Sequence, residues 1–166
     1  MIEKRQVQNL SLAWQTTADN VIREYFQQLF LAQLYQGKGF DGLLFKGGTA
    51  LRIIWHSPRF SEDLDFTGDN ITIKEIEALM EGALAKMEMM GIEDEIIESK
   101  STSGGYLAIF KFITSEYNSQ IQIEVSKRRG KNGKGSAVLI QSDLGIPYTL
   151  IHLKESKLVA EKIQAC

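Results

Sequence analysis

Hydrophobic positions in the first part of the chain recur at helical spacing. Residues 3–35 contain no glycine or proline, and one apolar face recurs about every fourth position, formed by Leu10, Trp14, Val21, Tyr25 and Leu29. This pattern predicts one long helix or two shorter ones. The glycines in residues 37–39 then end it.

The pattern changes repeatedly over the rest of the chain. A short apolar run at residues 43–45 predicts a buried strand, and residues 49–55 predict a helix that begins on a glycine pair. Thr72 and Glu75 form a capping-box signature that opens a helix reaching residue 90. Alternating or short apolar segments predict further strands at residues 62–67, 92–99, 106–114, 120–126 and 137–140. A helical pattern starts at residue 154 and continues to the end.

Strands that mostly follow one another, with helices at the start, middle and end, favour an α+β or mixed α/β layer structure over a regular doubly wound sheet. We expect three stretches along the chain. Residues 1–36 would be a helical segment packed on the core, residues 37–152 the core itself, and residues 153–166 the start of a further helical region.

Composition is that of an ordinary globular protein. The 166 residues are 43% hydrophobic and 24% charged, which suits one domain. The net charge of -2 means that any nucleic-acid contact needs a local basic patch. Cys166 is the only cysteine, so no disulfide framework or cysteine metal site is expected. A charged start without an apolar segment, and no long apolar run, predict a cytoplasmic protein without a membrane partner.

Two aspartates share one face of the strand predicted at residues 62–67. Leu64 and Phe66 would point into the core, so Asp63 and Asp65 would lie on the other face, about 6–7 Å apart. Carboxylates this close raise each other's pKa, and a divalent cation such as Mg²⁺ or Mn²⁺ relieves the repulsion. Asp-x-Asp is also common on solvated strands, so the tripeptide alone does not decide between the two interpretations.

A glycine pair one helix upstream changes that balance. Gly47 and Gly48 stand between a predicted strand and a helix start, where backbone N–H groups and the helix dipole can bind phosphate. Thr49 could add its hydroxyl. A tight turn would also explain the glycines, and the chain has no P-loop sequence.

Together the two segments resemble a known double motif. Residues 46–51 read Lys-Gly-Gly-Thr-Ala-Leu, and residues 59–66 read Arg-Phe-Ser-Glu-Asp-Leu-Asp-Phe. This order is similar to the first motif of nucleotidyltransferases of the DNA polymerase beta superfamily, and in particular to the AbiEii/AbiGii toxin family. The resemblance implies a mixed, largely antiparallel sheet flanked by helices, and a metal held by Asp63 and Asp65. It also implies a nucleotide-binding role for the glycine pair and Ser61.

The superfamily pattern requires a third carboxylate on a neighbouring strand. In the segment 120–126, Ile121, Ile123 and Val125 would be buried, which leaves Glu124 as the only acid on the other face. Glu124 is therefore the candidate third ligand, although the family more often has aspartate there. An exposed strand glutamate is the alternative interpretation.

A triphosphate also needs positive charge beyond the metal. Arg59 precedes the carboxylate strand, where it could reach the phosphates or pair with an aspartate. Lys46 adjoins the glycines and is a secondary candidate, because a buried strand could direct its side chain elsewhere. The final helix resembles the family's Ala-Glu-Lys-like motif, which implies a catalytic Lys162, with Lys157 as the second choice. The basic stretch Lys127–Lys134 is a candidate RNA-binding loop or an ordinary solvated hairpin.

The resemblance implies transfer of a nucleoside monophosphate from an NTP to an acceptor hydroxyl. The expected acceptor is RNA such as tRNA, and the expected role is the toxin of a toxin–antitoxin or phage-defence system with a cognate antitoxin. Nucleotidylation of a protein or small molecule, and a non-catalytic binding module, are the alternatives. The family's Arg-Asp segment and helical C-terminal half do not follow the last helix, so the sequence reads as truncated and its own activity stays open.

Overall fold

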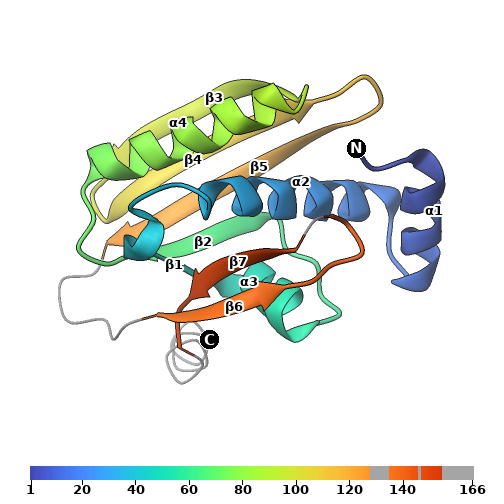
Figure 1. Ribbon diagram of the computed structural model, residues 1–166, viewed down its shortest axis with the longest axis horizontal. Helices are drawn as coiled ribbons and strands as arrows, with labels where there is room; N and C mark the ends of the chain where they lie inside the picture. Colours follow the sequence, from blue (N-terminus) through green and yellow to red (C-terminus); the bar gives the residue numbers. More distant parts are fainter. Residues whose placement is uncertain (128–134, 146, 155–166) are drawn as a thin grey trace.

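The computed structural model describes residues 1–127, 135–145 and 147–154. Within them, seven strands form one sheet in the order β3-β4-β5-β2-β1-β7-β6 (Figure 1). The helices are α1 (Lys4–Ala13), α2 (Ala18–Leu34), α3 (Gly47–Trp55) and α4 (Ile73–Met89), with a short 3-10 turn, η1 (Phe40–Gly42). The strands are β1 (Leu43–Lys46), β2 (Asp63–Gly68), β3 (Glu93–Thr102), β4 (Gly105–Ile113), β5 (Asn118–Lys127), β6 (Ser136–Ile140) and β7 (Tyr148–His152).

The sheet is mixed. Strands β2 and β5 pair in parallel, as do β1 and β7, while the β3–β4, β4–β5, β1–β2 and β6–β7 pairs are antiparallel. The predicted α+β class with a mixed sheet is therefore confirmed. Strands β2 and β1 lie at the centre, so the segments that carry the candidate site are held on both sides by neighbouring strands.

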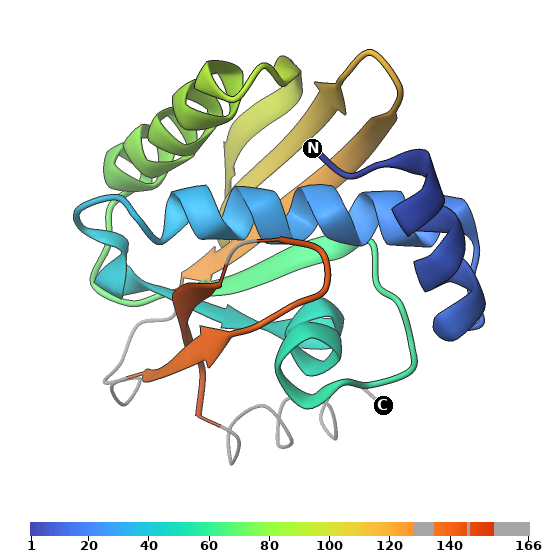
Figure 2. The same ribbon diagram turned by 45° about the vertical axis from the view of Figure 1, so that its right-hand side comes forward.

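One face of the sheet is covered by α2 and α4, and α2 runs along the middle of the sheet between α4 and the β6–β7 pair (Figure 2). Its rings pack on β4: Phe26 stacks on Phe112 at 5.8 Å between centroids, and Phe30 lies 5.9 Å from Phe110. Side chains of α1, α2, α4 and the sheet belong to one hydrophobic cluster. Since apolar burial is the main favourable term in folding, α2 is an integral part of the core.

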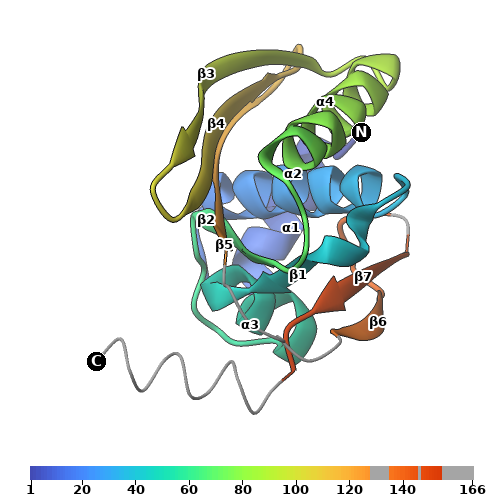
Figure 3. The same cartoon turned by 90° about the vertical axis from the view of Figure 1, so that its left-hand side faces the viewer.

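The third helix, α3, packs on β1 and β2 away from α4 (Figure 3). Trp55 at its end joins a small separate cluster with Leu44, Ile151 and Leu153. Because neighbouring residues in a strand point to opposite faces, Leu44 faces this small cluster while Phe45 faces the main core, to which Ala50 and Ile53 of α3 also belong. Lys46, two residues after Leu44, therefore points to the same face of the sheet as Leu44.

Local signals in the sequence explain several boundaries. The Thr72 hydroxyl accepts a hydrogen bond from the backbone N–H of Glu75, and the Glu75 carboxylate accepts one from the N–H of Thr72, which is the predicted capping box. Thr17 caps α2 through the N–H of Asn20, so the N-terminal apolar pattern forms two helices, not one.

One strand was not predicted. Strand β7 follows Pro147, alternates buried and exposed residues over only five positions, and pairs in parallel with distant β1. The predicted loop at residues 128–134 and most of the predicted helix from residue 154 lie outside the described residues. No helix in the described ranges is long and apolar enough to cross a membrane.

Candidate functional site

The two aspartates of β2 lie on the face of the sheet opposite the main core. Leu64 and Phe66 are fully buried, whereas Asp63 and Asp65 are half-buried. The period-two pattern predicts this arrangement, because the residues of a strand alternate between its faces.

Glu124 is brought to the same face by strand register. It is the direct partner of Asp65 across the parallel β2–β5 pair, and Gln122 is the partner of Asp63. Gln122 Nε2 donates a hydrogen bond of 2.7 Å to Glu124 Oε1. Paired residues on adjacent strands have neighbouring side chains, so the three acids occupy one patch.

The surroundings of Asp63 disfavour its negative charge. Burial raises the pKa of the Asp63 carboxyl above its usual value, and the carboxylates of Glu124 and Glu62 raise it further. Arg23 partly offsets them. Arg23 also forms an ion pair of 3.2 Å with Glu62. A cation bound at this patch would remove the repulsion among the acids.

This raised pKa predicts a pH-dependent stability difference. The contribution of Asp63 to stability is present below its unfolded-state pKa of about 3.9 and is lost as pH rises through the raised folded-state value. We therefore expect Asp63→Asn to have a higher Tm than the wild type at pH 7 in a chelator, with the gain vanishing below about pH 4. Thermal melts from acid to neutral pH, with exposed Asp41→Asn as the control, measure it. A lower Tm for Asp63→Asn at pH 7 would contradict it.

The glycine pair packs directly against the aspartate strand. Gly47 has a φ of +80°, and a side chain there would overlap the Asp65 carboxylate, whose Cγ would lie 2.9 Å from the added carbon. At Gly48 an added Cβ would lie 2.8 Å from the Ser61 hydroxyl oxygen. At position 47, only glycine combines the left-handed backbone with such a close approach. The turn at the start of α3 is therefore shaped around Asp65 and Ser61.

Thr49 joins α3 to β2. It is 1% exposed, and its hydroxyl donates a hydrogen bond of 2.5 Å to the backbone carbonyl of Asp63. The proton of the Thr49 hydroxyl is therefore engaged in a hydrogen bond within the protein. This contact fixes the position of α3 relative to β2, the strand that carries both aspartates.

Lys46 lies at the carboxylates. Its backbone is the cross-strand partner of Asp65 in the antiparallel β1–β2 pair, and its Nζ donates a hydrogen bond of 2.9 Å to Ser126 Oγ on β5. The side chain therefore spans the patch from β1 to β5. The sequence alone did not determine which face of the sheet the Lys46 side chain occupies. The structure places it on the same face as Asp65 and Glu124.

The segment before β2 is held by α2. Buried Gln27 donates hydrogen bonds to the backbone carbonyls of Ser61, at 3.1 Å, and Glu62, at 3.0 Å. Arg59, in the same segment, is exposed and forms no ion pair with a described residue. The sequence predicted that Arg59 either reaches the phosphates or pairs with an aspartate. The second of these, an ion pair with an aspartate, is not formed in the described structure.

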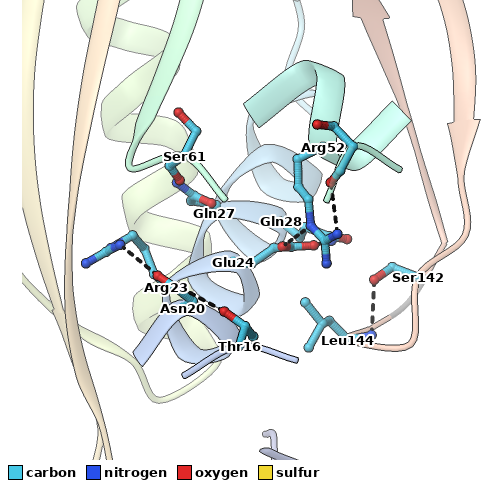
Figure 4. A network of polar contacts seen from close by, with 11 residues as sticks. Thr16, Asn20, Arg23, Glu24, Gln27, Gln28, Arg52, Ser61, Ser142 and Leu144 are labelled. Carbon is cyan, nitrogen blue, oxygen red and sulfur yellow. Dashed lines mark hydrogen bonds and ion pairs between the residues drawn. The ribbon is translucent and has the colours of Figure 1, made fainter. Parts of the chain in front are cut away.

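A buried ion pair fixes the other end of this segment (Figure 4). Arg52 of α3 pairs with Glu24 of α2 at 2.9 Å and donates a hydrogen bond of 3.0 Å to the carbonyl of Ser57. Its guanidinium also lies over the rings of Phe60, at 4.1 Å, and Trp14, at 4.9 Å. The pairing of Arg52 with Glu24 carried no signal in the sequence, because the two residues are distant along the chain.

Two depressions flank the acids. The first, which we call the Lys46 pocket, has a volume of about 340 Å³ and includes Lys46, Asp65, Glu124 and Ser126. The second, which we call the amide pocket, has a volume of about 410 Å³ and is lined by Asp19, Ile22, Arg23, Glu62, Asp63, Asn118, Ser119, Gln120 and Gln122. Asp65 and Asp63 therefore open onto different pockets.

Three acids on one face offer the hard oxygen donors that Mg²⁺ and Mn²⁺ prefer. Within the described residues, however, no three histidine, cysteine or acidic side chains are gathered as a metal-binding group. Glu124 is bonded to Gln122 and Asp65 packs on the glycine turn. The donor chemistry and register fit a divalent ion, and the role of these three residues as its ligands stays a prediction.

The remaining predicted site residues lie outside the described part of the chain. These are Lys157, Lys162 and the basic stretch after Lys127. Lys127 itself is exposed at the end of β5, on the strand that carries Glu124.

A family model described as the nucleotidyl transferase AbiEii toxin of a type IV toxin–antitoxin system matches residues 29–166. The chain belongs to the AbiEii family. The matched region contains every candidate residue that the sequence pointed to, from Lys46 to Lys162. No curated protein matches the chain.

Solved structures resemble this AbiEii-family chain in fold. JHP933 from Helicobacter pylori aligns with a TM-score of 0.59 and 18% identity, over 90% of this chain and 58% of that one. Another H. pylori structure, assigned as a nucleotidyltransferase, aligns with a TM-score of 0.57 and 18% identity, over 90% of this chain and 60% of that one. The present chain thus spans less than two thirds of the length of either.

Proposed function

We propose that this AbiEii-family chain carries the nucleotide and metal site of a nucleotidyltransferase toxin, which transfers a nucleoside monophosphate from an NTP to an acceptor hydroxyl. The observation that carries the proposal is the convergence of the glycine turn, Asp65 and Glu124 on one face of the sheet. Strand register and the α3 packing produce it, so it does not depend on exposed loops.

The triphosphate would bind on the side of the glycine turn. The backbone N–H groups at the start of α3 and the helix dipole favour an anion there. Lys46 adds positive charge beside Asp65, and exposed Arg59 is within the segment that precedes the strand. Thr49 and Gln27 hold α3 and this segment in place without contacting the phosphates.

Asp63, Asp65 and Glu124 are the residues that would hold Mg²⁺ or Mn²⁺. When bound, such ions neutralise the charge of the phosphates and bring the reacting oxygens together. Within the protein, Gln122 orients Glu124 through its hydrogen bond.

In the reaction, the acceptor oxygen forms a bond to the α-phosphorus, and the bond from that phosphorus to the bridging oxygen breaks. Pyrophosphate leaves, and the acceptor becomes a nucleotide ester. Glu124 is exposed on the shared face and is the residue we assign to receive the acceptor's proton. The proposed acceptor is RNA such as tRNA, with Lys127–Lys134 and a cognate antitoxin as further proposed contacts, in a toxin–antitoxin or phage-defence role.

Label transfer tests the proposal. The chain, and a version extended to the length of the two related structures, would be incubated with each labelled NTP, Mg²⁺ and total RNA. We expect label in the RNA fraction that disappears with RNase, with chelator and in Asp63→Ala. Transfer by Asp63→Ala equal to that of the wild type would reject the site. Label that survives RNase and disappears with protease would make a protein the acceptor.

A further inference from the structure

The amide pocket differs in charge from the Lys46 pocket. Among the described residues, its lining has the carboxylates of Asp19, Glu62 and Asp63 and one cation, Arg23. Arg23 is already paired with Glu62 at 3.2 Å. Apart from Asp63, a proposed metal ligand, these lining residues carry two carboxylates and one cation, so a polyphosphate placed here would face net negative charge and the pocket favours an uncharged polar ligand.

The hydrogen-bonding groups of the pocket are mostly amides. Asn118, Gln120 and Gln122 project from consecutive alternate positions of β5 along the same edge of the pocket. The side chains of Asn118 and Gln120 form no hydrogen bond with another described residue. Gln122 uses its Nε2 on Glu124, which leaves its carbonyl oxygen as an acceptor.

An amide offers a donor and an acceptor side by side. The edges of nucleobases carry the same pairs of groups, and ribose hydroxyls can both donate and accept. A row of amides next to the Asp63 carboxylate therefore suits a nucleoside better than a lipid or an aliphatic ligand. Ser119 and Ile22, which is 8% exposed, also line the pocket, so its apolar contribution is small.

The position of the pocket agrees with this chemistry. Asp65 packs on the glycine turn, where phosphate would bind, whereas Asp63 opens onto the amide pocket. We infer that the amide pocket is a nucleoside subsite, in which Asn118 and Gln120 recognise the uncharged base and sugar of a nucleotide. This inference rests on the proposed function and assigns the binding of the nucleoside to the amide pocket. The nucleoside belongs either to the incoming NTP or to the hydroxyl-bearing end of the acceptor RNA.

Equilibrium binding separates the two sources. Calorimetry in Mg²⁺ would compare the wild type, the double variant Asn118→Ala with Gln120→Ala, and Gln141→Ala, an exposed amide outside the pocket. The ligands are the four NTPs, inorganic tripolyphosphate, and a short RNA that ends in a free 3′-hydroxyl. We expect the double variant to bind NTPs or RNA about 10-fold more weakly, with tripolyphosphate unchanged. Weakening confined to the NTPs assigns the incoming nucleotide, and weakening confined to RNA assigns the acceptor end.

Other results would overturn the inference. An equal loss of affinity for tripolyphosphate would show a general effect on the site. A loss of nucleotide and RNA affinity no larger than that of Gln141→Ala would show that Asn118 and Gln120 do not recognise a nucleoside. A wild type that binds neither NTPs nor RNA would also exclude a nucleoside subsite. The proposed function fails separately, when label transfer is absent although the selective loss of binding is present.

Discussion

Gly47→Ala is expected to reduce nucleotidyl transfer by about 100-fold or more, since displacement of a reacting group by about 1 Å can have that effect. The added methyl would occupy the position of the Asp65 carboxylate, so either the carboxylate or the start of α3 must move. The left-handed backbone, with φ +80°, adds a conformational cost of about 1–2 kcal/mol. Overpacking adds about 1–3 kcal/mol. Transfer rates and urea unfolding of the same variant measure both effects.

Gly82→Ala is the matched control. Gly82 lies inside α4, and nothing lies within 4 Å of an added Cβ there. Alanine in a helix interior is more stable than glycine by about 0.5–1 kcal/mol, so this variant should gain stability and keep its activity. If Gly47→Ala behaves in the same way as Gly82→Ala, the turn does not shape the site.

Arg52→Met is expected to lower the free energy of unfolding by about 3–5 kcal/mol, because it leaves the buried carboxylate of Glu24 without its charged partner. The exposed fractions of the two side chains are 13% for Arg52 and 6% for Glu24. The variant also loses the hydrogen bond to Ser57 and the contact with the Phe60 ring. Urea denaturation gives the change.

Two further variants isolate the charge effect. The double variant Glu24→Gln with Arg52→Met removes both charges, so it should recover much of the loss. Gln28 would still donate to the oxygen at position 24. Arg23→Met removes an ion pair whose Glu62 side chain is 75% exposed, and should cost about 0–1 kcal/mol. A cost for Arg52→Met no larger than that of Arg23→Met would show that the buried pair contributes little.

The strands that carry the acids could be predicted because their patterns are local. Leu64 and Phe66 determine which way Asp63 and Asp65 point, and the isoleucines of β5 do the same for Glu124. That Asp65 lies opposite Glu124 could not be read from either strand, because register depends on how the whole sheet assembles.

The direction of Lys46 could not be predicted for a different reason. The other three residues of β1 are all buried, so the strand has no alternation from which to assign faces. Packing on both sides of a central strand removes the signal. Strand β7 is short and its partner is distant, and the ion pair of Glu24 with Arg52 joins two helices whose sequences give no sign of each other.

The parallel pairing of β2 with β5 has a consequence for the time at which the site forms during synthesis. Asp63 and Asp65 leave the ribosome well before Glu124, and β1 gains its second neighbour only when β7 has been made. Non-local pairing of this kind forms late in folding. The nascent chain therefore lacks the assembled acid patch until most of this sequence has been translated, and a shortened product that ends before β5 cannot assemble it.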